Sequence, residues 1–153
     1  MAFEGAASWL LAIHAVLAAA LVFACAWEVA LAWQLFRNRG DPDRLRLWAQ
    51  LVGVLFMLSF GVGSILYPTY RVRVRRDWLD LYAAWAVNLF DVKEDLVALG
   101  LPLAIVLFAF ARFGPKVIER EGRQLYLFAS VAVLVLVLVS ALSALVVTRV
   151  RGV

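Results

Sequence analysis

The chain has 153 residues, of which 65% are hydrophobic and 17% are charged, with a formal net charge of +4. Because about half the residues of a soluble domain are apolar, this composition indicates a membrane protein with one helical bundle and no separate soluble domain. The basic residues flank apolar runs, where they meet anionic lipid head groups, and this position argues against nucleic-acid binding. The single cysteine, Cys25, excludes an intrachain disulfide and two-thiol redox chemistry.

Long apolar runs are the main structural signal in the chain. Each run can cross about 30 Å of hydrocarbon, and only helices and closed barrels satisfy their backbone groups there. The first run starts near the N-terminus without a preceding Lys or Arg and is too long for a signal peptide, so we interpret it as a retained span. The sequence predicts spans over residues 6–36, 45–67, 96–113 and 125–148.

The predicted fold is an all-α, integral membrane four-helix bundle that forms a single four-span domain over residues 1–153. Pro68 is expected to end the second span, and Gly114-Pro115 to end the third. With four crossings, both termini and the segment 68–95 lie on one side of the membrane. We expect a multi-pass protein of the cell membrane, which is the inner membrane if the source is bacterial.

The segment between the second and third spans carries a basic strip followed by an aromatic pattern. Its four arginines at 71–76 are expected to be extended, and Asp77 is a cap candidate for the helix that follows. Large apolar residues then recur at helical spacing on one face, which predicts a short interfacial amphipathic helix over residues 77–90. These residues are Trp78, Leu81, Tyr82, Trp85 and Leu89.

Charge does not determine which side of the membrane each end faces. The loops at 37–46 and 112–123 carry eight Lys and Arg residues, and the opposite side carries seven. The positive-inside rule needs a clear bias, so the orientation stays open.

Two ionisable residues, His14 and Glu28, fall inside the first span. They share one helix face with small residues such as Ala18 and Cys25, and we expect a bundle to turn this face inward. Fourteen residues separate them, which is about 21 Å along a helix, so they belong to different leaflets.

Each of these two residues has a structural and a functional interpretation. His14 is either a neutral imidazole that bonds to a neighbouring helix, or a ligand, quinone-contacting or proton-relay residue. Glu28 either snorkels, or pairs with Arg37 or another arginine of the 37–46 loop, or it is a proton-coupling carboxylate of a transporter.

The leaflet of His14 gathers the densest set of polar side chains in the sequence. The ends of the spans bring the candidate ligand-binding or proton-relay residues to one depth, where the 77–90 helix can cover them. We therefore expect the functional site there and not at Glu28, although such charges can also form a simple solvated helix start. The candidates are His14, Tyr67, Asp91, Lys93, Glu94 and Asp95.

Two functions of different classes remain compatible with the sequence. The first is a small membrane subunit or anchor of a larger electron-transfer or other energy-transducing complex, which contacts a quinone, haem or lipid near His14. The second is a small homo-oligomeric, proton-coupled transporter that uses Glu28 or the Asp91–Asp95 cluster. Either one implies membrane lipids and other membrane subunits, or further copies of the chain, as partners.

No catalytic or metal-binding motif is present, so we do not expect an enzyme that acts alone. One histidine cannot provide bis-histidine haem ligation within one copy. As an axial ligand of haem b, His14 needs Met57, a partner subunit or an open sixth position.

Overall fold

The computed structural model describes the backbone of residues 2–113 and 120–151, and side chains within 8–72, 74–113 and 122–150. These residues form helices and no strand, which confirms the all-α four-helix bundle. In chain order the helices are α1 (Ala2–Phe36), α2 (Pro42–Tyr70), the π-helix η1 (Arg71–Leu79), α3 (Asp80–Tyr82), α4 (Ala84–Phe113) and α5 (Arg120–Arg151).

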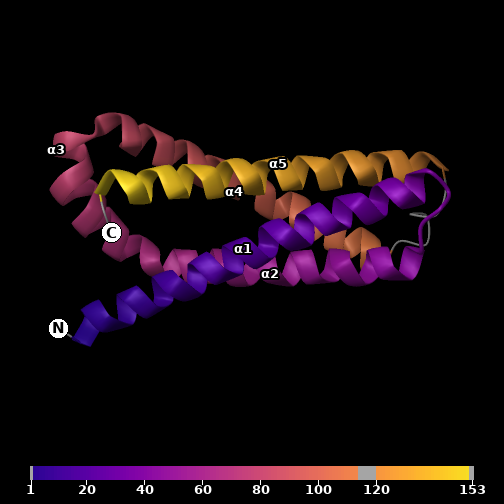
Figure 1. Ribbon diagram of the computed structural model, residues 1–153, viewed down its shortest axis with the longest axis horizontal. Helices are drawn as coiled ribbons and strands as arrows, with labels where there is room; N and C mark the ends of the chain where they lie inside the picture. The colour runs from indigo at the N-terminus through magenta and orange to yellow at the C-terminus, as the bar shows by residue number, and fades with distance from the viewer. Residues whose placement is uncertain (1, 114–119, 152–153) are drawn as a thin grey trace.

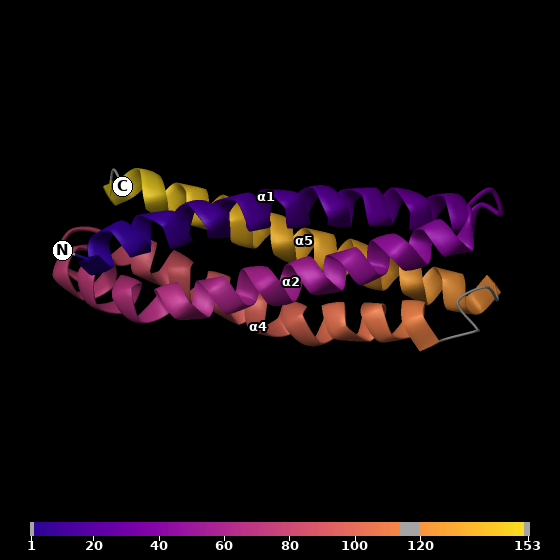
Figure 2. The same cartoon turned by 90° about the horizontal axis from the view of Figure 1, so that it is seen from below.

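The four long helices run along a common direction, and each packs on two others (Figures 1 and 2). α1 packs on α2 and α5, and α4 packs on the same two, so α1 and α4 form one diagonal pair of the bundle and α2 and α5 form the other. The chain ends and the 71–83 connection lie at one end, and the 37–41 turn lies at the other. We call these the His14 end and the Glu28 end.

The helix boundaries near the His14 end differ from those predicted. Pro68 does not end α2, because the N–H of Arg71 bonds to the carbonyls of Tyr67 and Pro68 and the chain continues into η1. The basic strip is therefore a π-helix and not an extended segment.

The segment 77–90 is helical but is not one separate helix. It spans the end of η1, the short α3 and the first turns of α4, with a break at Ala83 (φ −151°, ψ 57°). The third long helix thus starts at Ala84, twelve residues before the predicted 96, so Asp91–Asp95 are helical. Within this segment Trp78 is half-buried, whereas Tyr82 and Trp85 are exposed, as a lipid-facing aromatic surface requires.

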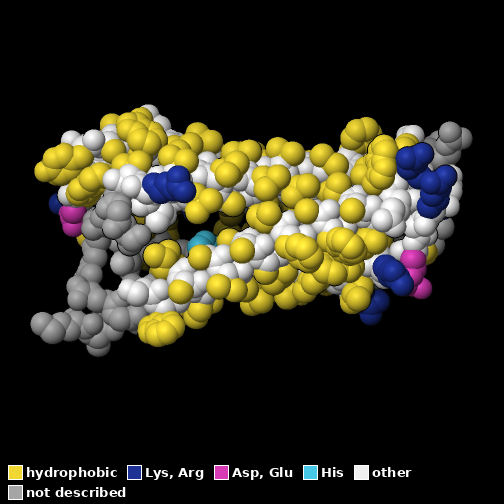
Figure 3. Space-filling view, viewed as in Figure 1, with side chains coloured by type: hydrophobic (Ala, Val, Ile, Leu, Met, Phe, Trp, Pro, Cys, Tyr) yellow, Lys and Arg dark blue, Asp and Glu magenta, His cyan; other side chains and the backbone are white. Residues whose placement is uncertain are grey.

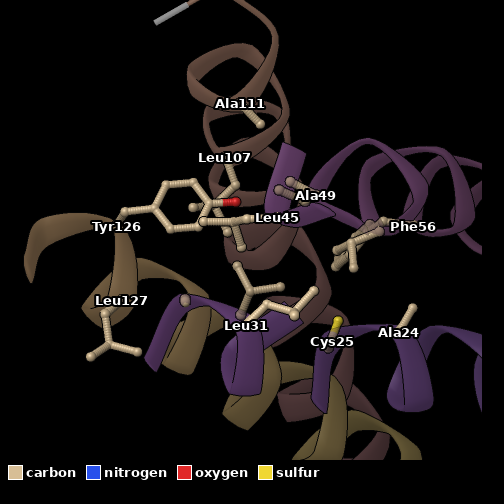
Figure 4. Packing of buried hydrophobic residues seen from close by; sticks show 14 of the residues in the cluster. Ala24, Cys25, Leu31, Leu45, Ala49, Phe56, Leu107, Ala111, Tyr126 and Leu127 are labelled. Atoms are coloured by element: carbon tan, nitrogen blue, oxygen red, sulfur yellow. The ribbon is translucent and has the colours of Figure 1, made fainter. Parts of the chain in front are cut away.

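The bundle interior is closely packed near the Glu28 end and at mid-height. The Tyr126 ring extends from α5 into the interior between Leu107 and Leu45 (Figure 4). Phe56 of α2 packs on Gly100 of α4, where an added Cβ atom would meet the Phe56 Cζ atom at 3.0 Å. In a membrane, where lipid is as apolar as leucine, such close contacts are what holds helices together.

The outer surface of the bundle is apolar along most of its length, with charged side chains near both ends (Figure 3). Large residues such as Trp9, Phe23 and Leu145 are mostly exposed, whereas soluble monomers rarely expose large apolar surfaces. Four helices are long and apolar enough to cross a membrane: Ser8–Phe36, Pro42–Tyr70, Ala84–Phe113 and Gly122–Val150. The chain is therefore a multi-pass membrane protein.

A second, smaller apolar cluster lies at the His14 end. Leu79 and Ala83 from the connection pack there against Ala86 and Val87 of α4 and Val147 of α5. This cluster fastens the connection to the bundle and positions the charged residues beside it.

Candidate functional site

Glu28 lies in the interior of the bundle, with 1% of its surface exposed. Its Oε1 atom accepts a hydrogen bond from the Tyr126 hydroxyl at 2.5 Å, and the Ser130 hydroxyl lies 3.4 Å from the same oxygen. The predicted pairing with Arg37 or another arginine of the 37–46 loop is therefore wrong. Because α5 offers two hydroxyls at the depth of Glu28, the carboxyl group turns inward and does not snorkel to the surface.

Sequence reasoning missed the α5 residues that surround Glu28. Tyr126 and Ser130 are four residues apart and so share one face of α5, next to Arg123 one turn earlier. Arg123 donates hydrogen bonds to the Leu35 carbonyl, at 3.3 Å, and to the Asn38 side chain. The missed signal was this run of polar residues at helical spacing in an otherwise apolar span.

His14 lies on the same face of α1 as Glu28, at the opposite end. Its imidazole packs on the backbone of Gly63 in α2, where an added Cβ atom would be 3.2 Å from Cε1. The ring also approaches the backbone of Ser59 and lies within electrostatic range of Lys93 on α4. Ser59-x-x-x-Gly63 is thus a contact surface for α1, as its small residues indicate.

Two polar contacts join the other elements at the His14 end. Tyr67 of α2 donates a hydrogen bond to Glu94 of α4 at 3.5 Å. Arg75 of η1 forms a bidentate ion pair with Asp91, with N–O distances of 2.8 and 3.2 Å. The π-helix and the early start of α4 place these partners together, so η1 supplies a residue that the sequence did not single out.

Lys93 lies near this network but remains outside its hydrogen bonds. Its Nζ atom is 5.0 Å from the centre of the Phe90 ring, on which Tyr70 stacks at 3.9 Å. Among the residues that the structure describes, Lys93 has no hydrogen-bond or ion-pair partner, although Glu94 is within electrostatic range.

Two of the proposed site residues are not brought into the cluster. Asp95 is exposed on the outer face of α4. Met57, the proposed second haem ligand, is 50% exposed, two residues from the inward-facing Ser59. The structure therefore does not pair Met57 with His14. In the described part of the chain, no three His, Cys, Asp or Glu side chains form a group suited to a metal ion.

Both ends have buried polar atoms without a partner among the described residues, but they differ in kind. At the Glu28 end the atom is Arg123 Nε, which belongs to a guanidinium group that already bonds to Leu35 and Asn38 through another nitrogen. At the His14 end, the buried atoms His14 Nδ1 and Tyr70 Oη have no partner among the described residues. Towards its N-terminus α1 diverges from α5, and the single histidine is visible beside an opening between the helices (Figures 1 and 3). Buried polar groups normally have partners, so this end has unused bonding capacity.

No protein-family model matches the sequence, and no curated protein or solved structure is significantly similar to it.

Proposed function

We propose that this chain is a small subunit or anchor of a larger energy-transducing membrane complex, and that its His14 end contacts a lipid-soluble molecule. Four apolar helices that pack around ionisable side chains at the His14 end are typical of a membrane subunit that holds a ligand beside partners. Electron transfer through a quinone or haem is the form of this function that the polar residues favour.

The observation that carries the proposal is the opening beside His14 (Figure 3). The Tyr67–Glu94 and Arg75–Asp91 contacts lie at the same end of the bundle, and the buried atoms His14 Nδ1 and Tyr70 Oη have no partner among the described residues. Ligand sites in helical membrane proteins have this character, with a few polar groups at an apolar cavity between helices.

The Glu28 end gives less support to a transporter. Its carboxyl group is enclosed by Tyr126, Ser130 and the main apolar core. A coupling carboxylate needs access to water from each side in turn. In this conformation Glu28 instead links α1 to α5.

The test is to purify the protein from membranes in mild detergent and to identify what remains bound. An absorption spectrum detects haem, and solvent extraction with mass spectrometry detects quinone or lipid. We expect a bound lipid-soluble molecule in wild type and in Glu28→Gln, and its loss in His14→Ala.

A second pair of variants separates site damage from helix damage. Gly63→Ala places a methyl group against the His14 ring, whereas the Cβ atom of Gly61→Ala meets nothing within 4 Å. Only Gly63→Ala should lower occupancy. If Glu28→Gln loses the bound molecule while His14→Ala keeps it, the subunit function is wrong and the transporter function is favoured. The subunit role is contradicted if the tagged chain migrates in native gels only with copies of itself and without other proteins.

A further inference from the structure

We propose that the His14 end selects a neutral head group with carbonyl acceptors, of the quinone class, and that Lys93 is the donor that binds it. This inference rests on the proposed function and adds the chemistry of the ligand. Three observations support this inference: the hydrogen bonds that the polar groups already make, the balance of their charges, and their positions in the bundle.

Two acidic groups at this end, Glu94 and Asp91, already have donors. Glu94 accepts from Tyr67 at 3.5 Å, and Asp91 accepts both N–H groups of Arg75. A ligand that brings donors would share these two carboxylates with Tyr67 and Arg75. Lys93, with three N–H donors, has no bonded acceptor among the described residues, so the unused capacity is mainly that of a donor.

The charge balance favours a neutral ligand over an anion. Arg75 and Asp91 cancel as a pair, and the charge of Lys93 is opposed by Glu94 within electrostatic range. A phosphate head drawn to Lys93 would therefore also face Glu94. A carbonyl oxygen accepts a hydrogen bond from Lys93 without adding charge to a site partly shielded from water.

The helix arrangement gives such a head group a place to sit. His14 and Lys93 project from the diagonal helices α1 and α4, which do not pack on each other as their neighbours do. The stacked rings of Tyr70 and Phe90 place an apolar group beside Lys93, and His14 Nδ1 can donate or accept according to its tautomer. The opening between α1 and α5 leads to the lipid-facing surface, where an apolar tail belongs.

Three probes with the same decyl tail test this inference on the purified full-length protein: decyl-benzoquinone, decylbenzene and decyl phosphate. Binding is measured by equilibrium dialysis in detergent after bound molecules are removed. We expect decyl-benzoquinone to bind at least about tenfold more tightly than decylbenzene, as one hydrogen bond to a charged group provides. Decyl phosphate should bind more weakly than the quinone.

Variants at two cations assign the donor. Lys93→Met should weaken quinone binding by about tenfold or more and leave decylbenzene unchanged, since only the hydrogen bond is lost. Lys93→Arg, which keeps a donor, should restore part of the affinity. Arg76→Met, an exposed cation of η1, is the matched control and should bind like wild type. Circular dichroism melts check that each variant is folded.

The outcomes separate this inference from the proposed function. Equal binding of decylbenzene and quinone overturns the donor role of Lys93, while binding of a lipid-soluble ligand stands. Tighter binding of decyl phosphate overturns the neutral head group and assigns the site to an anionic lipid. If no probe binds the emptied wild type, the inference and the proposed function both fail.

Discussion

Glu28 and His14 lie on the same face of α1, about four helical turns apart, yet their surroundings are opposite in kind. Glu28 is 1% exposed and has hydroxyl partners on α5. His14 is only partly buried, and its Nδ1 atom has no partner in the described part of the chain. One inward face of a single helix thus contains both a closed and an open polar site.

The difference arises from what α5 supplies at each end. Near Glu28 it presents Tyr126 and Ser130 at a spacing of four residues, and α1 stays close to it. Near His14 α1 diverges from α5, and the facing helix is α2, whose Gly63 has no side chain to bond the ring. An ionisable residue that faces inward can therefore stabilise a helix pair or leave capacity for a ligand, according to its neighbours.

The largest expected effect concerns the side of the membrane on which each end lies. Asp80→Cys at the His14 end and Arg39→Cys at the Glu28 end should be labelled by an impermeant maleimide from opposite sides, in an all-or-none pattern. Cys25 is 1% exposed, so the wild-type background should be negligible. The neighbouring Gly40 is unsuitable as a labelling position, because the Cβ atom of a cysteine there would lie 2.5 Å from the Leu35 backbone nitrogen. Labelling of both variants from one side contradicts the four-span fold.

The next effect tests whether the Glu28 end is structurally closed. Tyr126→Phe removes the shorter hydrogen bond to Glu28 and leaves a buried carboxyl group with one weak donor. We expect the free energy of unfolding to fall by about 1–2 kcal/mol, measured by unfolding in increasing SDS. Tyr82→Phe, at a site 72% exposed, is the control and should change nothing. If Tyr126→Phe leaves the free energy of unfolding unchanged, the Glu28 end is not held closed by this hydrogen bond and the contrast between the two ends is lost.

A smaller effect is expected for the ion pair at the His14 end. Arg75 and Asp91 are 30% and 44% exposed, so water screens their attraction. A double-mutant cycle with Arg75→Gln and Asp91→Asn should give a coupling energy of about 0.2–1 kcal/mol. A coupling energy well above 2 kcal/mol would mean that this end is as tightly closed as the other.

The smallest effect on stability is expected at His14 itself. With no bond to Nδ1, His14→Ala should lower the free energy of unfolding clearly less than Tyr126→Phe does. Added decyl-benzoquinone should then stabilise wild type, because a ligand that binds only the folded state shifts unfolding. It should not stabilise His14→Ala. Equal losses of stability in the two variants, without any ligand effect, would make His14 a structural residue.

The long helices and the inward face of α1 were predictable, because lipid forces each apolar run to bond its own backbone and drives ionisable residues inward. The partners of Glu28 were not, since they depend on α5 packing beside α1. The start of α4 was also missed. The charges at Asp91–Asp95 resemble a loop, whereas in the fold Arg75 and Tyr67 provide partners that let helical residues carry them. The functional roles of His14, Tyr67, Asp91, Lys93, Glu94 and Asp95 stay predictions.

The π-helix at Arg71–Leu79 makes the residue count of this connection matter more than its composition. Each π-type hydrogen bond spans one residue more than an α-type bond, as from the N–H of Asp80 to the carbonyl of Arg75. If the same residues wound as an ordinary α-helix, each wide turn would take up about one residue fewer, and the side chains that follow it would rotate by about 100°. Leu79 would leave its apolar cluster, and Arg75 would swing away from Asp91. The wide turns of the π-helix thus set the rotation at which Leu79 reaches its apolar cluster and Arg75 reaches Asp91.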